Sequence, residues 1–118
     1  MIVIAKFSGF LGINFIGTDI QMAKGYWIAR VDVSNEDAYG RYRELNGIAF
    51  TKFGGRFVVR GPAGKVVKGV ARKHNVVLEF PTYEAALACY ESPEYQAAKK
   101  FLDLVGEVDL IIIPEYDA

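Results

Sequence analysis

Three charged side chains that interrupt apolar, strand-like stretches carry the most suggestive chemistry in this sequence. Arg30 lies within one such stretch, Arg60 ends a second, and Glu79 is the only acid of a third. If the three stretches are neighbouring strands in suitable register, the two guanidinium groups lie beside the carboxylate. One interpretation is an ion network inside the sheet or at a dimer interface, where an unpaired charge would be costly. The alternative is an anion-binding pocket, in which both arginines hold a carboxylate or enolate oxygen.

The pocket interpretation also needs a group that moves a proton. Glu79 is one candidate, and Tyr39 and Asn46 on the expected first helix are two others. Flanking arginines would keep Glu79 ionised, and a fully paired carboxylate is a poor base. The tyrosines on the expected helices are typical of core residues whose hydroxyl reaches water, with a ligand cage as the alternative. The candidate catalytic residues are therefore Glu79 and Tyr39, and the candidate ligand-binding residues are Arg60, Arg30 and Asn46.

Cysteine and histidine are scarce, with one of each in the chain. Cys89 has no partner for an intramolecular disulfide, which is typical of a reducing compartment and predicts a cytoplasmic location. Since no histidine lies near it in sequence, we expect a small core residue rather than a nucleophile. His74 is expected at the surface, at the entrance of a strand, rather than as a ligand or base. The sequence therefore predicts neither a metal nor a cofactor.

Length and charge narrow the range of partners. A chain of 118 residues makes one domain with a single core. Lys plus Arg and Asp plus Glu both number 14, and no basic arm appears, so nucleic-acid binding is not expected. A small organic ligand, anionic or aromatic, is the partner that the candidate residues favour.

The first 21 residues differ from the rest of the sequence. They are apolar, but Lys6, Asn14 and three glycines interrupt them, and they are too short to span a membrane. Met22 opens a stretch that reads like a natural protein start. Residues 1–21 are therefore interpreted as an N-terminal extension or an arm added for expression, and residues 22–118 as the domain. If ordered, residues 2–7 would form an added edge strand or an arm lying on a partner subunit.

The candidate residues are positioned by a regular succession of elements. Residues 26–33 alternate between an apolar and a mixed face and predict a strand. Ser34 is the expected N-cap of an amphipathic helix that ends at the glycine pair 54–55. Residues 56–60 predict a second strand, and residues 76–80 a third, which Pro81 ends. Residues 65–71, before the third strand, are expected to be a short hairpin arm or a loop.

The second half of the chain contains two consecutive helix starts. Thr82 can cap a short helix, and Ser92 followed by Pro93 is the start of another. This second helix is expected to run to Val105, with Gly106 closing it. Residues 108–113 then predict the last strand.

The order strand, helix, strand, strand, helix, strand is the α+β ferredoxin-like βαββαβ arrangement, with an antiparallel sheet and the helices on one face. The other face of the sheet would expose a large apolar patch. A second copy of the same sheet is the simplest cover. The sequence therefore predicts a homodimer through the sheet faces.

Several motifs also resemble a known family in order and spacing. They are the stretches 24–31, 52–57, 59–61, 79–81 and 90–96, together with Tyr39 and Tyr42. These are similar to the DUF1330 family of small uncharacterised proteins over about residues 23–114. The resemblance implies the dimeric α/β-barrel fold shared with antibiotic-biosynthesis monooxygenases, haem-degrading enzymes and muconolactone isomerases. It implies no particular reaction, because one fold hosts many chemistries.

Two classes of function follow as expectations. The first is a cofactor-independent enzyme, with monooxygenase-like or isomerase-like chemistry on a small carbonyl or aromatic metabolite, and rests on superfamily analogy. The second is a non-catalytic dimeric module that binds small molecules or has a stress-related role. An enclosed pocket of a few hundred cubic ångströms that reaches Arg30, Arg60 or Glu79 would favour the enzyme. A solid core with these charges mutually paired would favour the module.

Overall fold

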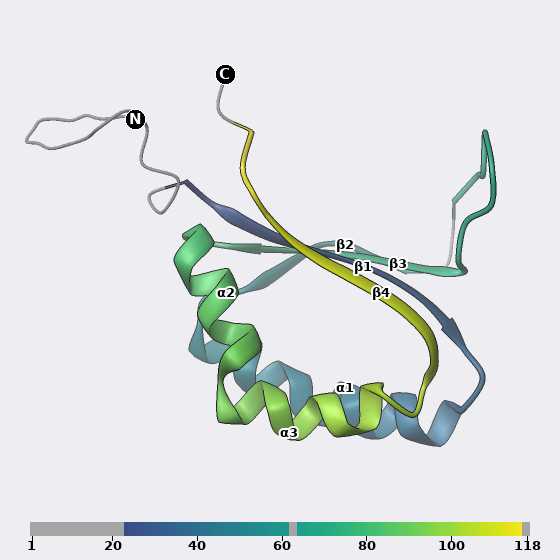
Figure 1. The fold of residues 1–118 in the computed structure, drawn as a ribbon, viewed down its shortest axis with the longest axis horizontal. Coiled ribbons are helices and arrows are strands. Elements are labelled where there is room, and N and C mark those ends of the chain that lie inside the picture. The colour runs from purple at the N-terminus through teal and green to yellow at the C-terminus, as the bar shows by residue number, and fades with distance from the viewer. Residues whose placement is uncertain (1–22, 62–63, 117–118) are drawn as a thin grey trace, which may run out of the picture.

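The computed structural model describes residues 23–61 and 64–116, so the expected N-terminal extension lies outside the described residues. Four strands form one antiparallel sheet in the order β2-β3-β1-β4, and the helices cover one of its faces (Figure 1). The predicted ferredoxin-like α+β arrangement is therefore confirmed. In chain order the elements are β1 (Gly25–Val33), α1 (Glu36–Lys52), β2 (Arg56–Gly61), β3 (His74–Phe80), α2 (Tyr83–Glu91), α3 (Pro93–Leu102) and β4 (Gly106–Pro114).

The two helix starts in the second half of the chain lie where the sequence predicts them. The Thr82 hydroxyl accepts a hydrogen bond from the backbone N–H of Ala85 at 3.0 Å. The Ser92 hydroxyl accepts one from the N–H of Tyr95 at 3.1 Å, and Pro93 is the first residue of α3. Proline is tolerated there because the first helical N–H has no partner within the helix. The chain therefore bends between α2 and α3.

Two expected helix ends are wrong. The N-cap of α1 is Asn35, whose side-chain oxygen accepts from the N–H of Ala38 at 3.1 Å, and not Ser34. The Ser34 hydroxyl instead donates to the carbonyl of Val105 and ties the start of α1 to the start of β4. Helix α3 ends at Leu102, earlier than expected, and Gly106 begins β4 with φ 148°. A Cβ at Gly106 would collide with the Asp32 carbonyl oxygen, so glycine is needed for this close approach.

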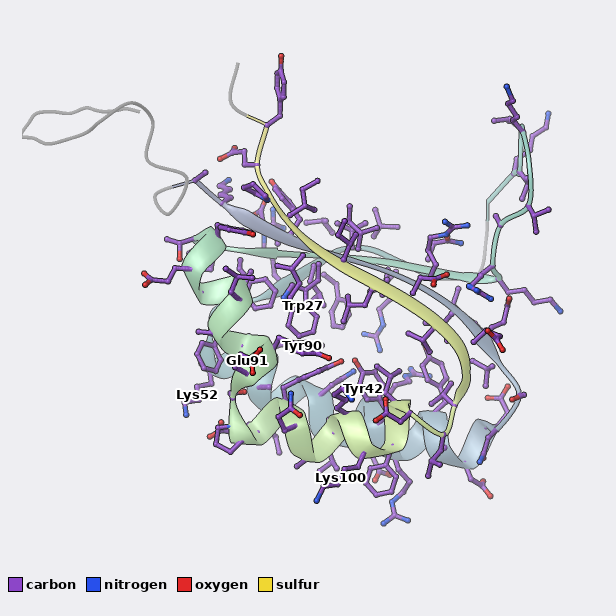
Figure 2. All side chains as sticks on the ribbon, in the orientation of Figure 1. Trp27, Tyr42, Lys52, Tyr90, Glu91 and Lys100 are labelled. Carbon is purple, nitrogen blue, oxygen red and sulfur yellow. The ribbon has the colours of Figure 1, made fainter. Side chains whose placement is uncertain are left out.

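The core lies between the sheet and the helices and is built around Trp27. Its ring packs edge-on against Phe50 and Tyr95, at centroid distances of 5.3 Å and 4.8 Å. Its indole N–H donates to the carbonyl of Ala86 at 2.9 Å. Figure 2 shows Trp27 in the layer between the sheet and the helices. This hydrogen bond satisfies the one polar atom of a side chain that is otherwise buried in apolar surroundings.

The buried face of α1 includes Ala38, Tyr42 and Ala49, which recur at helical spacing. Leu45 and Phe53 are only partly buried, whereas Asn46 and Phe50 are buried. The expectation for Cys89 is confirmed, because its side chain is fully buried in the core. Burial, followed by the charge of Glu94, raises the pKa of the Cys89 thiol to about 12. An un-ionised, inaccessible thiol is a structural residue and not a nucleophile.

Within residues 23–61 and 64–116, no helix covers the second face of the sheet, here called the uncovered face (Figure 1). Apolar side chains of all four strands lie on it, and Ile111 and Ile113 are 57% and 38% exposed. Residues 64–73, here called the arm, rise from the same side of the sheet and carry the highly exposed Val67 and Val70. No helix in the described ranges is long and apolar enough to cross a membrane.

One arginine fastens the base of the arm to the sheet. Arg72 pairs with Asp109 at 2.8 Å and with Asp32 at 3.0 Å, and Glu107 lies 4.0 Å from it. Hydrogen bonds to Asp109 and Asp32 raise the pKa of Arg72 further. The base of the arm is therefore held where β1 ends and β4 begins.

Candidate functional site

A pocket lies between α1 and the helix-covered face of the sheet. Trp27, Val31, Leu78 and Leu110 form apolar walls from the strands. Its enclosed volume is about 40 Å³, and its outer part opens to solvent. This enclosed volume is far smaller than the few hundred cubic ångströms of typical ligand cavities. It accepts a few water molecules or a head group of similar size.

The polar side chains of the pocket come mainly from one face of α1. Tyr39, Tyr42, Arg43 and Asn46 follow the helical spacing that places residues three or four positions apart on the same side. Arg60 of β2 joins them from the sheet. The pocket thus combines an apolar floor with hydroxyl, amide and guanidinium groups, which is the usual make-up of a small-molecule site.

A β-bulge turns Arg60 toward this pocket. Phe57 pairs with Leu78, but the next pair is Val59 with Val77, so one residue of β2 is skipped. Arg60 is consequently opposite Val76, on the helix-covered face. Without the bulge it would be opposite Asn75 and would face the other way, since a shift of one residue exchanges the two faces of a strand.

Both arginines of the pocket rest on aromatic rings. The Arg60 guanidinium lies 4.3 Å from the Phe57 ring centroid, and that of Arg43 lies 5.6 Å from the Tyr39 ring centroid. Within residues 23–61 and 64–116 neither arginine makes an ion pair. Cation–π contacts hold the guanidinium planes in place and leave their N–H edges available to a ligand.

Two buried tyrosines, Tyr42 in the lining and Tyr95 behind it, are joined through their hydroxyl groups. The hydroxyls of Tyr42 and Tyr95 are 2.9 Å apart, and the Asn46 amide lies beside the Tyr42 hydroxyl. Burial raises the pKa of Tyr42 to about 12, although the hydrogen bonds from Tyr95 and Asn46 oppose the rise. Burial, and then the neighbouring Tyr42, raise the pKa of Tyr95 strongly. Both phenols stay protonated at neutral pH and can serve as hydrogen-bond donors, not as bases.

The expected cluster of Arg30, Glu79 and Arg60 does not form. Arg30 lies opposite Asn75, four residues along β3 from Glu79, which lies opposite Tyr26. Arg60 is on the other face of the sheet because of the bulge in β2. The three strands are neighbours in the expected order, but their register separates the charges. Arg30 instead donates to the Val70 carbonyl of the arm at 3.5 Å.

Glu79 belongs to an ion network on the uncovered face. Its carboxylate accepts from the Tyr26 hydroxyl at 2.8 Å and from Arg56 at 3.0 Å, and Lys24 lies 3.8 Å away. The hydrogen bond from Tyr26, and then that from Arg56, lower the pKa of Glu79. This arrangement matches the ion-network interpretation, with partners other than the expected arginines. A carboxylate held by three groups is a poor proton acceptor.

His74 is less exposed than expected. It pairs with Val31 on the helix-covered face, and its ring lies 5.6 Å from that of Tyr39. The histidine is therefore half-buried beside the rim of the pocket. Over the described part of the chain, no group of three or more His, Cys, Asp or Glu side chains could hold a metal ion.

Comparison with known proteins identifies the family. The DUF1330 profile, "Domain of unknown function", matches residues 24–116. The chain belongs to the DUF1330 family. No curated protein matches the sequence.

Solved structures share the fold of this DUF1330 member. A protein of unknown function from Rhodopseudomonas palustris is 20% identical, with a TM-score of 0.66 over 82% of this chain and 85% of that one. A dimeric ferredoxin-like protein of unknown function from Bacteroides fragilis is 13% identical, with a TM-score of 0.52 over 78% and 96%. SnoaB, a cofactor-independent oxygenase from Streptomyces nogalater, is 11% identical, with a TM-score of 0.56 over 81% and 96%. At these identities the similarity shows the fold alone.

The structure thus divides the five predicted residues of this DUF1330 member into two groups. Arg60, Asn46 and Tyr39 line one pocket, whereas Glu79 and Arg30 lie on the uncovered face. Arg43 also lines the pocket and was missed by sequence reasoning. Its position four residues after Tyr39 and three before Asn46 is the signal that could have found it.

Proposed function

We propose that this protein is a homodimer that binds a small carbonyl or aromatic molecule in the pocket between α1 and the sheet. The observation that carries the proposal is the concentration of Tyr39, Arg43, Asn46 and Arg60 around an apolar floor. Asn46 is 9% exposed, and its amide lies beside the Tyr42 hydroxyl and lines the pocket, where it can offer a further hydrogen bond to a ligand. Such convergent polar groups are the feature that distinguishes a binding site from an ordinary core.

The proposed chemistry is that of a cofactor-independent enzyme, of the monooxygenase or isomerase type. Arginine N–H groups stabilise the negative charge on the oxygen of a carbonyl compound that enters the pocket as its enolate. Tyr39, and the Tyr42 hydroxyl deeper in the pocket, can donate hydrogen bonds to the same oxygen. By analogy of fold, support comes from SnoaB, a cofactor-independent oxygenase.

A non-catalytic small-molecule-binding module is the second candidate. The observation that favours it is the lining of the pocket. Its described residues include no carboxylate, and burial raises the pKa of the Tyr42 phenol. The small enclosed volume also agrees better with this alternative. Oxygen consumption and isomer formation with a panel of phenols and 1,3-diketones separate the two. Turnover that Arg60→Gln abolishes supports the enzyme, and binding without turnover supports the module.

The proposed dimer forms through the uncovered faces of two sheets. Ile111, Ile113 and Val59 would leave an apolar surface in water in a single chain, and a second sheet would bury it. The arm rises on the same side and would flank the partner subunit. The dimeric Bacteroides fragilis protein, which shares the fold, supports this assembly. The buried, unpaired Cys89 supports a cytoplasmic location.

Native mass spectrometry of the protein purified from its own host tests assembly and ligand together. The expected spectrum shows the mass of two chains with a retained small molecule, and collisional activation releases that molecule. A companion preparation of Arg60→Gln is expected to keep the dimer mass and lose the additional mass. A spectrum of single chains would contradict the assembly. Equal additional mass on both proteins would place the ligand elsewhere.

A further inference from the structure

Arg43 and Arg60 differ from the arginines that have structural partners. Arg56 is paired with Glu79, and Arg72 with Asp32 and Asp109. In the described part of the chain, Arg43 and Arg60 have no carboxylate within ion-pair distance, and both line the pocket. Two guanidinium groups with no counter-charge beside the same opening produce a positive potential there.

The two arginines approach the pocket from different elements. Arg43 comes from α1 and lies over Tyr39 of the same helix, whereas Arg60 comes from β2 and lies over Phe57 of the same strand. Each guanidinium is thus positioned by a ring of its own element, and a ligand between α1 and β2 can contact both. The bulge in β2 is what brings Arg60 to this side.

We infer that Arg43 and Arg60 form a clamp that selects a small planar organic anion, a carboxylate or an enolate, over a neutral molecule of the same shape. The planar fork of each guanidinium matches the two oxygens of a carboxylate or of a 1,3-diketone enolate. The enclosed volume of about 40 Å³ suits such a head group, and the remainder of the ligand lies in the open mouth.

The lining also determines the form in which the ligand arrives. Trp27, Tyr42 and Asn46 on the inner side offer no group that would accept a proton at neutral pH. Glu79 is on the uncovered face, and His74 lies beside Tyr39 at the rim and outside the lining. The clamp therefore takes molecules that are already ionised in water, such as carboxylates and acidic enols. Simple ketones, whose ionisation needs a strong base, are excluded. This inference rests on the proposed pocket and names its ligand class.

Isothermal titration calorimetry with two matched pairs of probes tests the clamp. The first pair is benzoate and benzamide, which share a shape and differ in charge. The second pair is 1,3-cyclohexanedione, an enolate at neutral pH, and its neutral methyl enol ether. We expect each anion to bind at least about tenfold more tightly than its neutral partner, as a charge-assisted hydrogen bond implies.

Variants at the two arginines assign the selectivity to the clamp. Arg43→Gln and Arg60→Gln should each weaken benzoate binding about ten- to a hundredfold and leave the weak binding of benzamide unchanged. Arg43→Lys and Arg60→Lys keep the charge without the fork and should lose part of the affinity. Arg41→Gln is the control, because Arg41 is on the same helix but lies over Phe101 and near Glu44. Melting temperatures confirm that each variant is folded.

The outcomes separate this inference from the proposed function. Equal affinity for charged and neutral probes, or an equal loss with Arg41→Gln, would overturn the clamp while leaving a pocket that binds small molecules. Binding of neutral aromatic compounds without binding of either anion would likewise overturn the clamp and leave the pocket. Failure of every anionic and neutral probe to bind would contradict both the clamp and the proposed pocket.

Discussion

Glu79 is held on the uncovered face by a phenol, a guanidinium and an ammonium group. The bonds from Tyr26 and Arg56 favour its charged form and place its pKa below the ordinary value in the folded protein. A carboxyl whose pKa is lower in the folded than in the unfolded state contributes stability above the unfolded pKa. That contribution is lost as the pH falls through the folded pKa. Acid should therefore weaken this network.

The lowered pKa of Glu79 in the folded protein leads to a prediction for Glu79→Gln. The free energy of unfolding of the wild type should exceed that of the variant at neutral pH, and the difference should shrink as the pH falls below about 4. Urea denaturation at a series of pH values measures it. Glu44→Gln, on an exposed face of α1, is the control and should show almost no difference at any pH. A gap that widens on acidification would contradict the assigned direction.

At the residue scale, the sequence indicated which side chains line the pocket better than it indicated which side chains contact one another. Arg60 and Asn46 were expected to bind a ligand, and both line the pocket. The expected contact of Arg60 with Glu79 is wrong for two reasons. Arg60 is opposite Val76, three residues along β3 from Glu79, and the skipped residue in β2 places it on the other face of the sheet. Such a bulge leaves no clear mark in the run 56–60, so pairing partners could not be read from the sequence.

At the scale of elements, the junction of α2 and α3 depends on one hydroxyl. Ser92 accepts from the N–H of Tyr95 and also donates to the carbonyl of Cys89 at 2.7 Å. The side chain is buried, so water cannot readily replace these bonds. Ser92 therefore bonds to the last turn of α2 and to the first turn of α3.

Ser92→Ala should accordingly destabilise the protein by about 1 kcal/mol or somewhat more, the usual cost of a lost N-cap. Chemical denaturation followed by circular dichroism measures the change. Ser92→Thr, which keeps the hydroxyl, is the matched comparison and should recover part of the loss. An unchanged denaturation midpoint for Ser92→Ala would show that the cap does not hold this junction.

The same elements show why helix ends were only partly predictable. Thr82 and Ser92 each precede a helix with an acid in its first turn, and both caps are confirmed. At α1 two adjacent residues, Ser34 and Asn35, can both serve as caps. A tertiary contact decides between them, because Ser34 is used to reach the Val105 carbonyl. Local sequence carries no information about that distant partner.

At the scale of the whole molecule, the two faces of the sheet have different roles. One face holds the core and the pocket with the help of α1, α2 and α3. The other face is apolar, and no helix of the described residues covers it (Figure 1). The alternating pattern of the strands predicted this division. The sequence could not show how far the arm rises or how small the enclosed pocket is, because both depend on side-chain packing.

A substitution on the uncovered face tests the proposed dimer. Ile111→Glu should convert the protein to single chains at micromolar concentration, because a charge would have to be buried in the interface. Ile48→Glu is the control, since Ile48 is 58% exposed on α1 and Ile111 is 57% exposed on β4. Multi-angle light scattering distinguishes the two masses. A dimer of unchanged stability in Ile111→Glu would show that the sheet faces are not the interface.

The proposed function requires that small molecules bind between α1 and the sheet. The chain has one tryptophan, and Trp27 lines the pocket, so its indole N–H gives a single resolved nuclear magnetic resonance signal at the site. Titration of nitrogen-labelled protein with benzoate should shift this signal together with the side-chain amide of Asn46 and the Nε–H of Arg60. The Nε–H of Arg56, which donates to Glu79 on the uncovered face, should remain in place. Shifts confined to Tyr26 and Arg56, or no shift of the Trp27 indole at saturation, would contradict the account.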